Sequence, residues 1–326
     1  MVRLAALLCA LAAALAGCGG GESGGTADRP NEEASLLLDF TPNAVHAGIY
    51  LATAREYDEA EGVELDVRAP GASTDALRLL QAGRVDMAIL DIHDLALARE
   101  QGRDVVGVMA LVQRPLASVL AQPAVARPRD LEGKRAGVSG LPSDVAVLRS
   151  IVQGDGGDPD SVKTTTIGFE AVKALLARRV DAATAFWNVE GVALKAQRPG
   201  IREFRVDDYG APAYPELVLC VSRTTLDEKR PVVRATIRAL RRGYGEAQND
   251  PESAVLALTD ANPDLDRAAA DAQLDAVAPA FTAGAQVYGE LREDVLEQWA
   301  DWDLKFGIVK KPIDVGSAFD LALAAP

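Results

Sequence analysis

Short apolar runs alternate with amphipathic segments along most of the chain. The runs at 36–40, 85–90 and 105–112 have the length and composition of buried strands. Segments at 47–57 and 94–101 have the apolar spacing of helices. Strands that alternate with helices form largely parallel sheets covered on both faces. The pattern therefore predicts an α/β fold.

A second α/β set begins after Pro123 and Pro128, and the apolar run at 217–221 crosses back to the first. The segment 115–120 is predicted as a strand that leaves the first lobe. We therefore expect two α/β lobes joined by a hinge, with a ligand cleft between them where strand and helix ends converge. The predicted boundaries are 35–122 with 218–326 for the first lobe and 123–217 for the second.

The C-terminal part of the chain is predicted to be mainly helical. A long helix is expected from Pro231 to about residue 248, and Pro251 and Pro263 mark the starts of further helices.

The N-terminus has the pattern of an export signal. An apolar run at 4–15 follows Arg3 and is too short to span a bilayer. It ends in Leu-Ala-Gly-Cys18, which resembles a bacterial lipobox. The resemblance implies cleavage before Cys18, lipid on Cys18 and a membrane-anchored, extracytoplasmic protein, with residues 1–18 as signal and 19–34 as a flexible tether. The alternative is an ordinary secretory signal with an incidental cysteine.

Composition narrows the class of function. The chain has 326 residues and a formal net charge of −14, which suggests two domains and argues against nucleic-acid binding. After cleavage and lipidation only Cys220 remains, so a disulfide within the mature chain is excluded. We find no catalytic triad, Walker A motif or metal-ligand spacing, so no metal site and no cofactor are predicted.

Three segments carry a family resemblance. Residues 38–50 read LDFTPNAVHAGIY and resemble the opening motif of a family that contains bacterial binding proteins for thiamine-precursor pyrimidines and fungal pyrimidine-phosphate synthases. Residues 137–144 and 181–191 match two further motifs of that family, and the similarity spans roughly 36–300. It implies a periplasmic-binding-protein fold of type II. It also implies a monomeric solute-binding protein that closes on a small-molecule ligand and delivers it to an ABC permease.

The resemblance also marks candidate ligand-binding residues. A flat polar heterocycle would be held by aromatic rings and by side chains that pair with ring nitrogens and an amino group. The candidates are Phe40, Asn43, His46, Asp91, His93, Ser139, Trp187, Asn188 and Glu190. The alternative interpretations are core packing for Phe40 and Trp187, turn formation for Asn43 and Ser139, helix capping for both histidines, and a solvated helix-start charge for Glu190.

Three other functions stay open. Relatives bind riboflavin, alkyl sulfonates or other small solutes, and a sensor lipoprotein would use the same clamp. A synthase is disfavoured, because the family's synthases have a cysteine-rich segment near the third motif and a lysine near the motif histidine. This chain has no cysteine at 185–188 and no lysine around His46.

Overall fold

The computed structural model describes residues 31–70 and 76–325. The predicted signal segment, Cys18 and residues 19–30 of the predicted tether lie outside the described residues. The prediction for the last tether residues is wrong, because the first strand begins at Glu32. Glu32 and Glu33 pair in register with Val63 and Glu64, so the ladder extends beyond the apolar run that marked the strand in the sequence.

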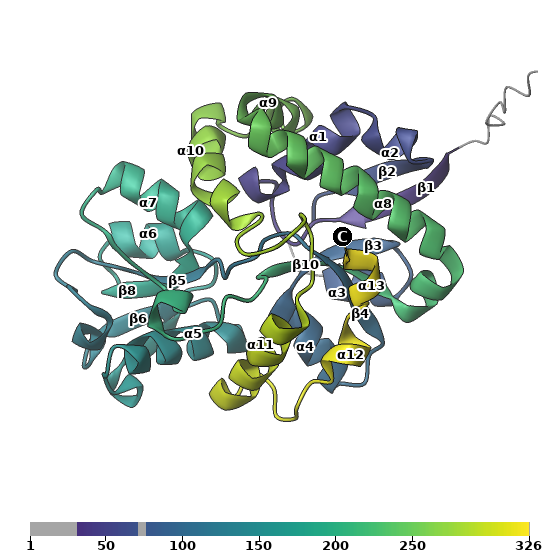
Figure 1. The fold of residues 1–326 in the computed structure, drawn as a ribbon. Coiled ribbons are helices and arrows are strands. Elements are labelled where there is room, and N and C mark those ends of the chain that lie inside the picture. The colour runs from purple at the N-terminus through teal and green to yellow at the C-terminus, as the bar shows by residue number, and fades with distance from the viewer. Residues whose placement is uncertain (1–30, 71–75, 326) are drawn as a thin grey trace, which may run out of the picture. The chain divides into compact units, whose positions relative to one another are not determined.

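Two five-stranded sheets organise the described residues (Figure 1). The first sheet has the order β2-β1-β3-β10-β4. Its strands are β1 (Glu32–Leu37), β2 (Val63–Arg68), β3 (Met87–Asp91), β4 (Val105–Ala110) and β10 (Leu217–Ser222). Strand β1 pairs parallel with β2 and β3, and β10 runs antiparallel between β3 and β4.

The second sheet repeats this plan in the order β7-β6-β8-β5-β9. Its strands are β5 (Ala117–Ala121), β6 (Arg135–Val138), β7 (Lys163–Thr166), β8 (Ala182–Phe186) and β9 (Arg202–Arg205). Strand β6 pairs parallel with β7 and β8, and β5 is antiparallel to β8 and β9. The chain thus changes sheets before β5, so the prediction that the first lobe extends to residue 122 is wrong. The partners of β5 lie more than 60 residues away in sequence, where no local pattern could indicate them.

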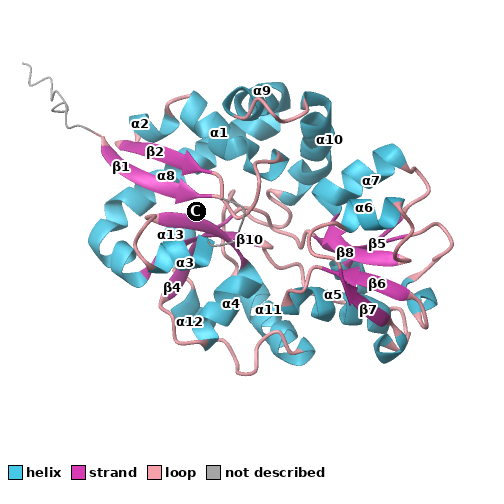
Figure 2. Cartoon of the chain, turned by 180° about the vertical axis from the view of Figure 1, so that it is seen from behind, coloured by secondary structure: helices cyan, strands magenta, loops and turns pink. Residues whose placement is uncertain are grey.

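Helices cover both sheets (Figures 1 and 2). The second sheet carries α5 (Pro142–Gly154), α6 (Ala171–Leu176) and α7 (Val192–Gln197). The N-terminal helices of the first sheet are α1 (Ala47–Ala54), α2 (Tyr57–Ala60), α3 (Ala76–Gln81) and α4 (Ile92–Glu100). The C-terminal helices are α8 (Arg223–Asn249), α9 (Pro251–Ala261), α10 (Arg267–Val277), α11 (Glu293–Phe306), α12 (Val315–Ala318) and α13 (Leu321–Ala324).

One of the three predicted helix starts is wrong. Helix α8 begins at Arg223, where the Ser222 side chain accepts a bond from the Thr225 amide, but the backbone angles of Lys229 are not helical, so two helical segments meet there and the second begins beside Pro231 as predicted. The proline lacks an amide hydrogen, and the helix is kinked beside it at Lys229. Helix α9 begins at Pro251 as predicted. Helix α10 begins only after Asp266, whose carboxylate caps it, and not at Pro263.

The close crossing of α1 and α8 holds the 43–50 segment against the core. A Cβ atom on Gly48 would lie 2.3 Å from Cγ of Tyr244, so only glycine allows this approach. The Tyr244 hydroxyl donates to the carbonyl of Val45 at 2.7 Å. These contacts fix the loop that follows β1.

In the described part of the chain, no helix combines the length and apolar character needed to cross a bilayer.

Candidate functional site

A cavity of about 160 Å³ is lined by residues from both sheets. A buried water needs about 10–15 Å³ on the same measure, so the space suits a small molecule. Phe40 and Asp91 line it at the carboxyl ends of β1 and β3, and Ser139 and Glu190 follow β6 and β8. All four were predicted as ligand-binding residues, and the cavity lies at the strand ends where the α/β pattern placed a cleft.

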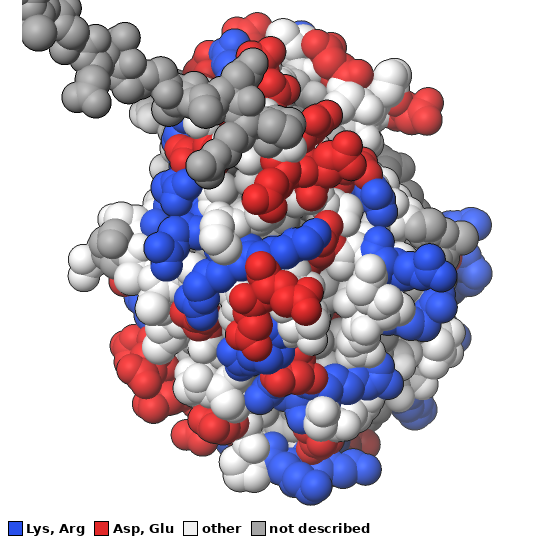
Figure 3. Space-filling model, turned by 90° about the vertical axis from the view of Figure 1, so that its right-hand side faces the viewer, with Lys and Arg blue, Asp and Glu red and all other residues white. Residues whose placement is uncertain are grey.

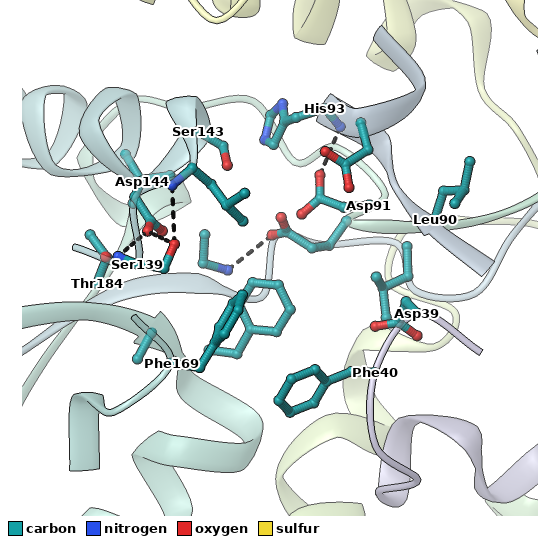
Figure 4. A pocket seen from close by; sticks show the side chains of 18 of the residues that line it. Asp39, Phe40, Leu90, Asp91, His93, Ser139, Ser143, Asp144, Phe169 and Thr184 are labelled. Carbon is teal, nitrogen blue, oxygen red and sulfur yellow. Dashed lines mark hydrogen bonds between the residues drawn. The ribbon is translucent and has the colours of Figure 1, made fainter. Parts of the chain in front are cut away.

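Two aromatic rings from different lobes approach each other at this cavity (Figure 4). The ring centroids of Phe40 and Phe169 are 6.0 Å apart, with an angle of 50° between the rings. Phe169 is 57% exposed, so its ring is free to contact a ligand. Phe186, at the end of β8, adds a third ring to the lining.

A smaller adjoining cavity contains the most informative polar group. It shares Phe40, Phe186 and Glu190 with the larger cavity and is also lined by Asn43 and Asn188. The Asn188 side chain is buried, and neither its Oδ1 nor its Nδ2 atom has a hydrogen-bond partner among the described residues. A buried amide without partners is costly and rare in native proteins. This one offers a donor and an acceptor to a bound molecule.

His46 lies behind the cavity wall instead of in it. Its Nε2 atom is 2.8 Å from a carboxylate oxygen of Asp39, and its Nδ1 atom accepts the amide of Asn43 at 3.3 Å. The ring is fully buried and belongs to neither lining. His46 therefore orients Asp39, which does line both cavities. The Oδ1 atom of Asn43 accepts a hydrogen bond from the amide of Val45, so Asn43 also has the turn-forming role that was the alternative interpretation.

His93 lines the cavity from α4 and is tied into a buried cluster. Its Nδ1 atom lies 2.8 Å from a carboxylate oxygen of Asp303, and its Nε2 atom lies 3.3 Å from the hydroxyl of Tyr214. Burial alone would lower the pKa of His93. The carboxylates of Asp303, Asp91 and Glu216 outweigh burial and raise the pKa to about 10. These carboxylates therefore favour the protonated form of His93 at neutral pH.

Glu216 connects the two segments that cross between the sheets. One oxygen of its buried carboxylate accepts the amides of Leu116 at 2.6 Å and of Ala117 at 2.9 Å. Residues 116–117 enter the second sheet, and Glu216 stands directly before β10 of the first. Both strands of the hinge are thus held by one side chain. Burial raises the pKa of Glu216, because a carboxylate is poorly solvated there.

Asp91, His93 and Glu216 lie close enough to share a metal ion, with one donor atom of each within 4.8 Å of the others. The sequence suggested no metal site. An imidazolium has no lone pair to offer a metal, so ligation would first have to remove a proton held with a pKa of about 10. The protonated ring already supplies the positive charge between the two carboxylates.

The second-lobe wall is organised by side chains that satisfy backbone groups. Asp144, in the first turn of α5, accepts the amide of Ser139 at 2.6 Å and also its hydroxyl. Glu190 accepts the amide of Phe186 at 3.2 Å, and burial raises the pKa of Glu190. Both carboxylates still line the cavity.

Trp187 was predicted to stack on the ligand, but the structure places it behind the wall. Its indole nitrogen donates to the carbonyl of Pro115 at 2.9 Å, and the guanidinium of Arg205 lies 3.9 Å from the ring centroid. The ring is only 3% exposed and belongs to neither lining. Phe169 supplies the second-lobe ring instead.

Sequence reasoning missed several lining residues. Asp39 and Asp144 stand inside the quoted motifs, and Glu216 stands beside the return strand, so their positions were visible. Phe169 follows a glycine in a loop, where no sequence pattern indicates that its side chain lines a cavity. Asp94 was interpreted only as a helix start.

Comparison with known proteins places the chain in a family. The model of the NMT1/THI5-like family matches residues 43–254. The formylaminopyrimidine-binding protein of Halalkalibacterium halodurans is 33% identical over 234 residues, which cover 71% of each chain. A 4-amino-5-hydroxymethyl-2-methylpyrimidine phosphate synthase of Legionella pneumophila is 25% identical over 241 residues, covering 71% of this chain and 74% of the synthase.

Solved structures confirm the fold. The alkanesulfonate-binding protein SsuA of Xanthomonas axonopodis superposes with a TM-score of 0.70 at 18% identity, covering 89% of this chain and 99% of that one. The periplasmic aliphatic sulphonate-binding protein SsuA of Escherichia coli gives a TM-score of 0.71 at 16% identity, with coverage of 88% and 91%. The predicted two-lobed α/β fold of periplasmic binding proteins is therefore confirmed, and the chain belongs to the NMT1/THI5-like family.

Proposed function

We propose that this protein is an extracytoplasmic solute-binding protein that captures a thiamine-precursor pyrimidine and delivers it to an ABC permease. The observation that carries the proposal is Asn188, a buried amide with an unused donor and an unused acceptor beside the cavity. An aminopyrimidine presents a ring nitrogen next to an amino group, which is the complementary pair. The relative that binds formylaminopyrimidine supports the same ligand class.

Closure of the two lobes on the ligand would supply the mechanism. Phe40 comes from the first lobe and Phe169 from the second, so a ligand that packs beside this pair of rings contacts both lobes. A ligand that contacts both walls favours the closed state over the open one. We also propose that the protein is anchored to the membrane through lipid on Cys18 and that it is a monomer.

A binding protein fits the described site better than a synthase does. His46 is buried behind Asp39 and belongs to neither cavity lining. The lining formed by the described residues contains neither lysine nor cysteine. A family member that used a motif histidine, a nearby lysine and a cysteine cluster for synthesis would need those groups at the cavity.

The test is a ligand screen by thermal shift and calorimetry on the chain without its signal segment. Formylaminopyrimidine and 4-amino-5-hydroxymethyl-2-methylpyrimidine are expected to stabilise the protein, by about 2.7 kcal/mol at a ligand concentration of 100 times Kd. Riboflavin and an alkanesulfonate are expected to give no shift. The proposal fails if neither pyrimidine stabilises the protein.

The variant Asn188→Leu separates recognition from folding. Leucine has a similar size and removes a buried amide whose lack of partners costs about 1–3 kcal/mol, so the empty variant should be at least as stable as the parent. It should also lose pyrimidine binding. Asn249→Leu, at the exposed end of α8, is the control and should bind like the parent. Equal binding by Asn188→Leu and the parent would contradict the role of Asn188.

A further inference from the structure

Carboxyl groups dominate the cavity wall. Six of the described lining residues are acidic, namely Asp39, Asp91, Asp94, Asp144, Glu190 and Glu216. No lysine or arginine occurs among the lining residues in the described ranges, and the imidazolium of His93 is the basic group. The face shown in Figure 3 carries Lys, Arg, Asp and Glu intermixed, so the cavity lining differs from that face by its lack of lysine and arginine.

The acidic groups differ in what already binds them. Asp144 accepts from Ser139, Glu216 from two amides, and Asp39 faces His46. The imidazolium of His93 lies beside Asp303, outside the lining, as well as beside Asp91 and Glu216. Its one positive charge cannot balance all of these carboxylates.

On the first-lobe wall, the carboxylate of Asp94 lacks the hydrogen bonds that the other carboxylates accept. Asp94 stands in the first turn of α4, and none of the residues at 31–70 or 76–325 donates a hydrogen bond or forms an ion pair with its carboxylate. Burial raises the pKa of Asp94, the neighbouring charge of His93 offsets part of this rise, and the carboxylate of Asp39 adds to it. An unpaired carboxyl group in such a place gains most from a cationic partner.

Two further acidic groups have raised pKa values for the same reasons. Burial raises the pKa of Asp91 against the lowering effect of the His93 charge, and Glu216 and Asp94 add to the rise. Burial also raises the pKa of Glu190 against its backbone hydrogen bonds, and Asp144 adds to that rise. A cationic ligand would be stabilised beside these carboxyl groups, whereas an anionic ligand would have to be buried against them without a lysine or arginine among the described lining residues.

We propose that the cavity is selective for cations: it binds a pyrimidine that carries a protonated amine, with Asp94 as the partner of that amine, and it excludes phosphate esters and sulfonates. This inference rests on the proposed function for the pyrimidine ring itself. The unpaired amide of Asn188 would form hydrogen bonds with the pyrimidine ring, and the carboxyl groups would pair with the charge of its substituent.

The experiment compares three ligands that share one ring. They are 4-amino-2-methylpyrimidines with a 5-aminomethyl, a 5-hydroxymethyl or a 5-hydroxymethyl phosphate substituent, titrated calorimetrically near neutral pH. The ammonium compound should bind about tenfold more tightly than the alcohol, because a charge-assisted hydrogen bond replaces a neutral one. The phosphate should not bind measurably. Titration in two buffers of different ionisation enthalpy should reveal proton release with the ammonium compound.

Matched variants locate the effect. Asp94→Asn should bring the affinities of the ammonium compound and the alcohol close together, whereas Asp301→Asn, on the exposed side of α11, should leave their ratio unchanged. Binding of the phosphate as tightly as the alcohol, or no preference for the ammonium compound, would overturn cation selectivity while leaving the pyrimidine proposal standing. Failure of all three ligands and of formylaminopyrimidine would overturn the proposed function. Benzylamine is a cation without the pyrimidine edge. If benzylamine binds and none of the pyrimidines does, the proposed cation selectivity stands and the proposed pyrimidine ligand is rejected.

Discussion

The two walls of the cavity satisfy their polar groups to different degrees. On the first-lobe wall Asp39 faces His46, and Glu216 holds two hinge amides, so most of the buried groups are paired without a ligand. The second-lobe wall carries the orphaned amide of Asn188 and the half-exposed ring of Phe169. Among the described residues, the first wall leaves the carboxyl group of Asp94 without a hydrogen bond, whereas the second wall leaves the Asn188 amide unpaired and the Phe169 ring exposed.

The largest effect is expected where one side chain holds both hinge strands. Glu216→Ala leaves the amides of Leu116 and Ala117 buried without an acceptor, which should lower the free energy of unfolding by about 2–5 kcal/mol. Chemical denaturation measures the loss. Glu216→Gln keeps one acceptor oxygen and should lose less. An alanine variant as stable as the parent would show that the first wall does not depend on this residue.

A smaller loss is expected behind the first wall. Gly48→Ala forces a methyl group into the ring of Tyr244 and should cost about 1–3 kcal/mol of unfolding free energy. Gly245→Ala is the matched control, because nothing lies within 4 Å of the added carbon on the same helix pair. It should be neutral or stabilising by about 0.4–1 kcal/mol. If both variants behave alike, the close crossing of α1 and α8 does not position the 43–50 segment.

The buried imidazolium makes stability depend on pH. The pKa of His93 is about 10 in the folded chain, above the value of about 6.5 for an unfolded histidine. Its stabilising contribution is therefore complete below about pH 6.5 and is lost as pH rises towards 10, with a slope of at most about 1.4 kcal/mol per pH unit. The raised pKa values of Asp91, Asp94 and Asp303 act in the same direction at lower pH.

Denaturation midpoints across this pH range measure the effect. The parent should lose stability steadily, and His93→Gln should show a flatter profile between about pH 6.5 and 10 because its side chain does not titrate. Parallel profiles for parent and variant would place the titration elsewhere than the first-lobe wall.

The smallest effect belongs to the exposed ring of the second wall. Phe169→Ala should weaken pyrimidine binding by about 0.5–1.5 kcal/mol, which is roughly a threefold to tenfold rise in Kd. Its thermal midpoint without ligand should hardly change, since the ring is 57% exposed. Leu256→Ala, at another exposed apolar position, should leave Kd unchanged. An unchanged Kd in Phe169→Ala would remove this ring from the site.

The elements that sequence could predict are those decided by local chemistry. The fully buried strands β3, β4 and β10 are apolar runs, and Pro251 starts α9 because a proline suits the first turn of a helix. The sheet to which β5 belongs depends on partners distant in sequence. Pro231 likewise marks the second segment of α8, whereas the segment from Arg223 to the kink at Lys229 was not predicted.

The candidate site was predictable where a residue ends a strand. Phe40, Asp91 and Glu190 line the cavity because carboxyl ends of strands meet at the cleft. Trp187 also follows a strand, yet its indole turns to the carbonyl of Pro115, a contact across 72 residues of sequence. The same folding of the hinge that buries Trp187 leaves the next residue, Asn188, without partners. No pattern in the sequence distinguishes these two neighbours.

A crystal structure with bound formylaminopyrimidine tests the central claim most directly. The account predicts the ligand ring packed beside Phe40 and Phe169, with the amide of Asn188 within about 3.2 Å of a ring nitrogen or amino group of the ligand. A ligand bound elsewhere, or one bound in the cavity while the amide of Asn188 stays unpaired, would contradict it.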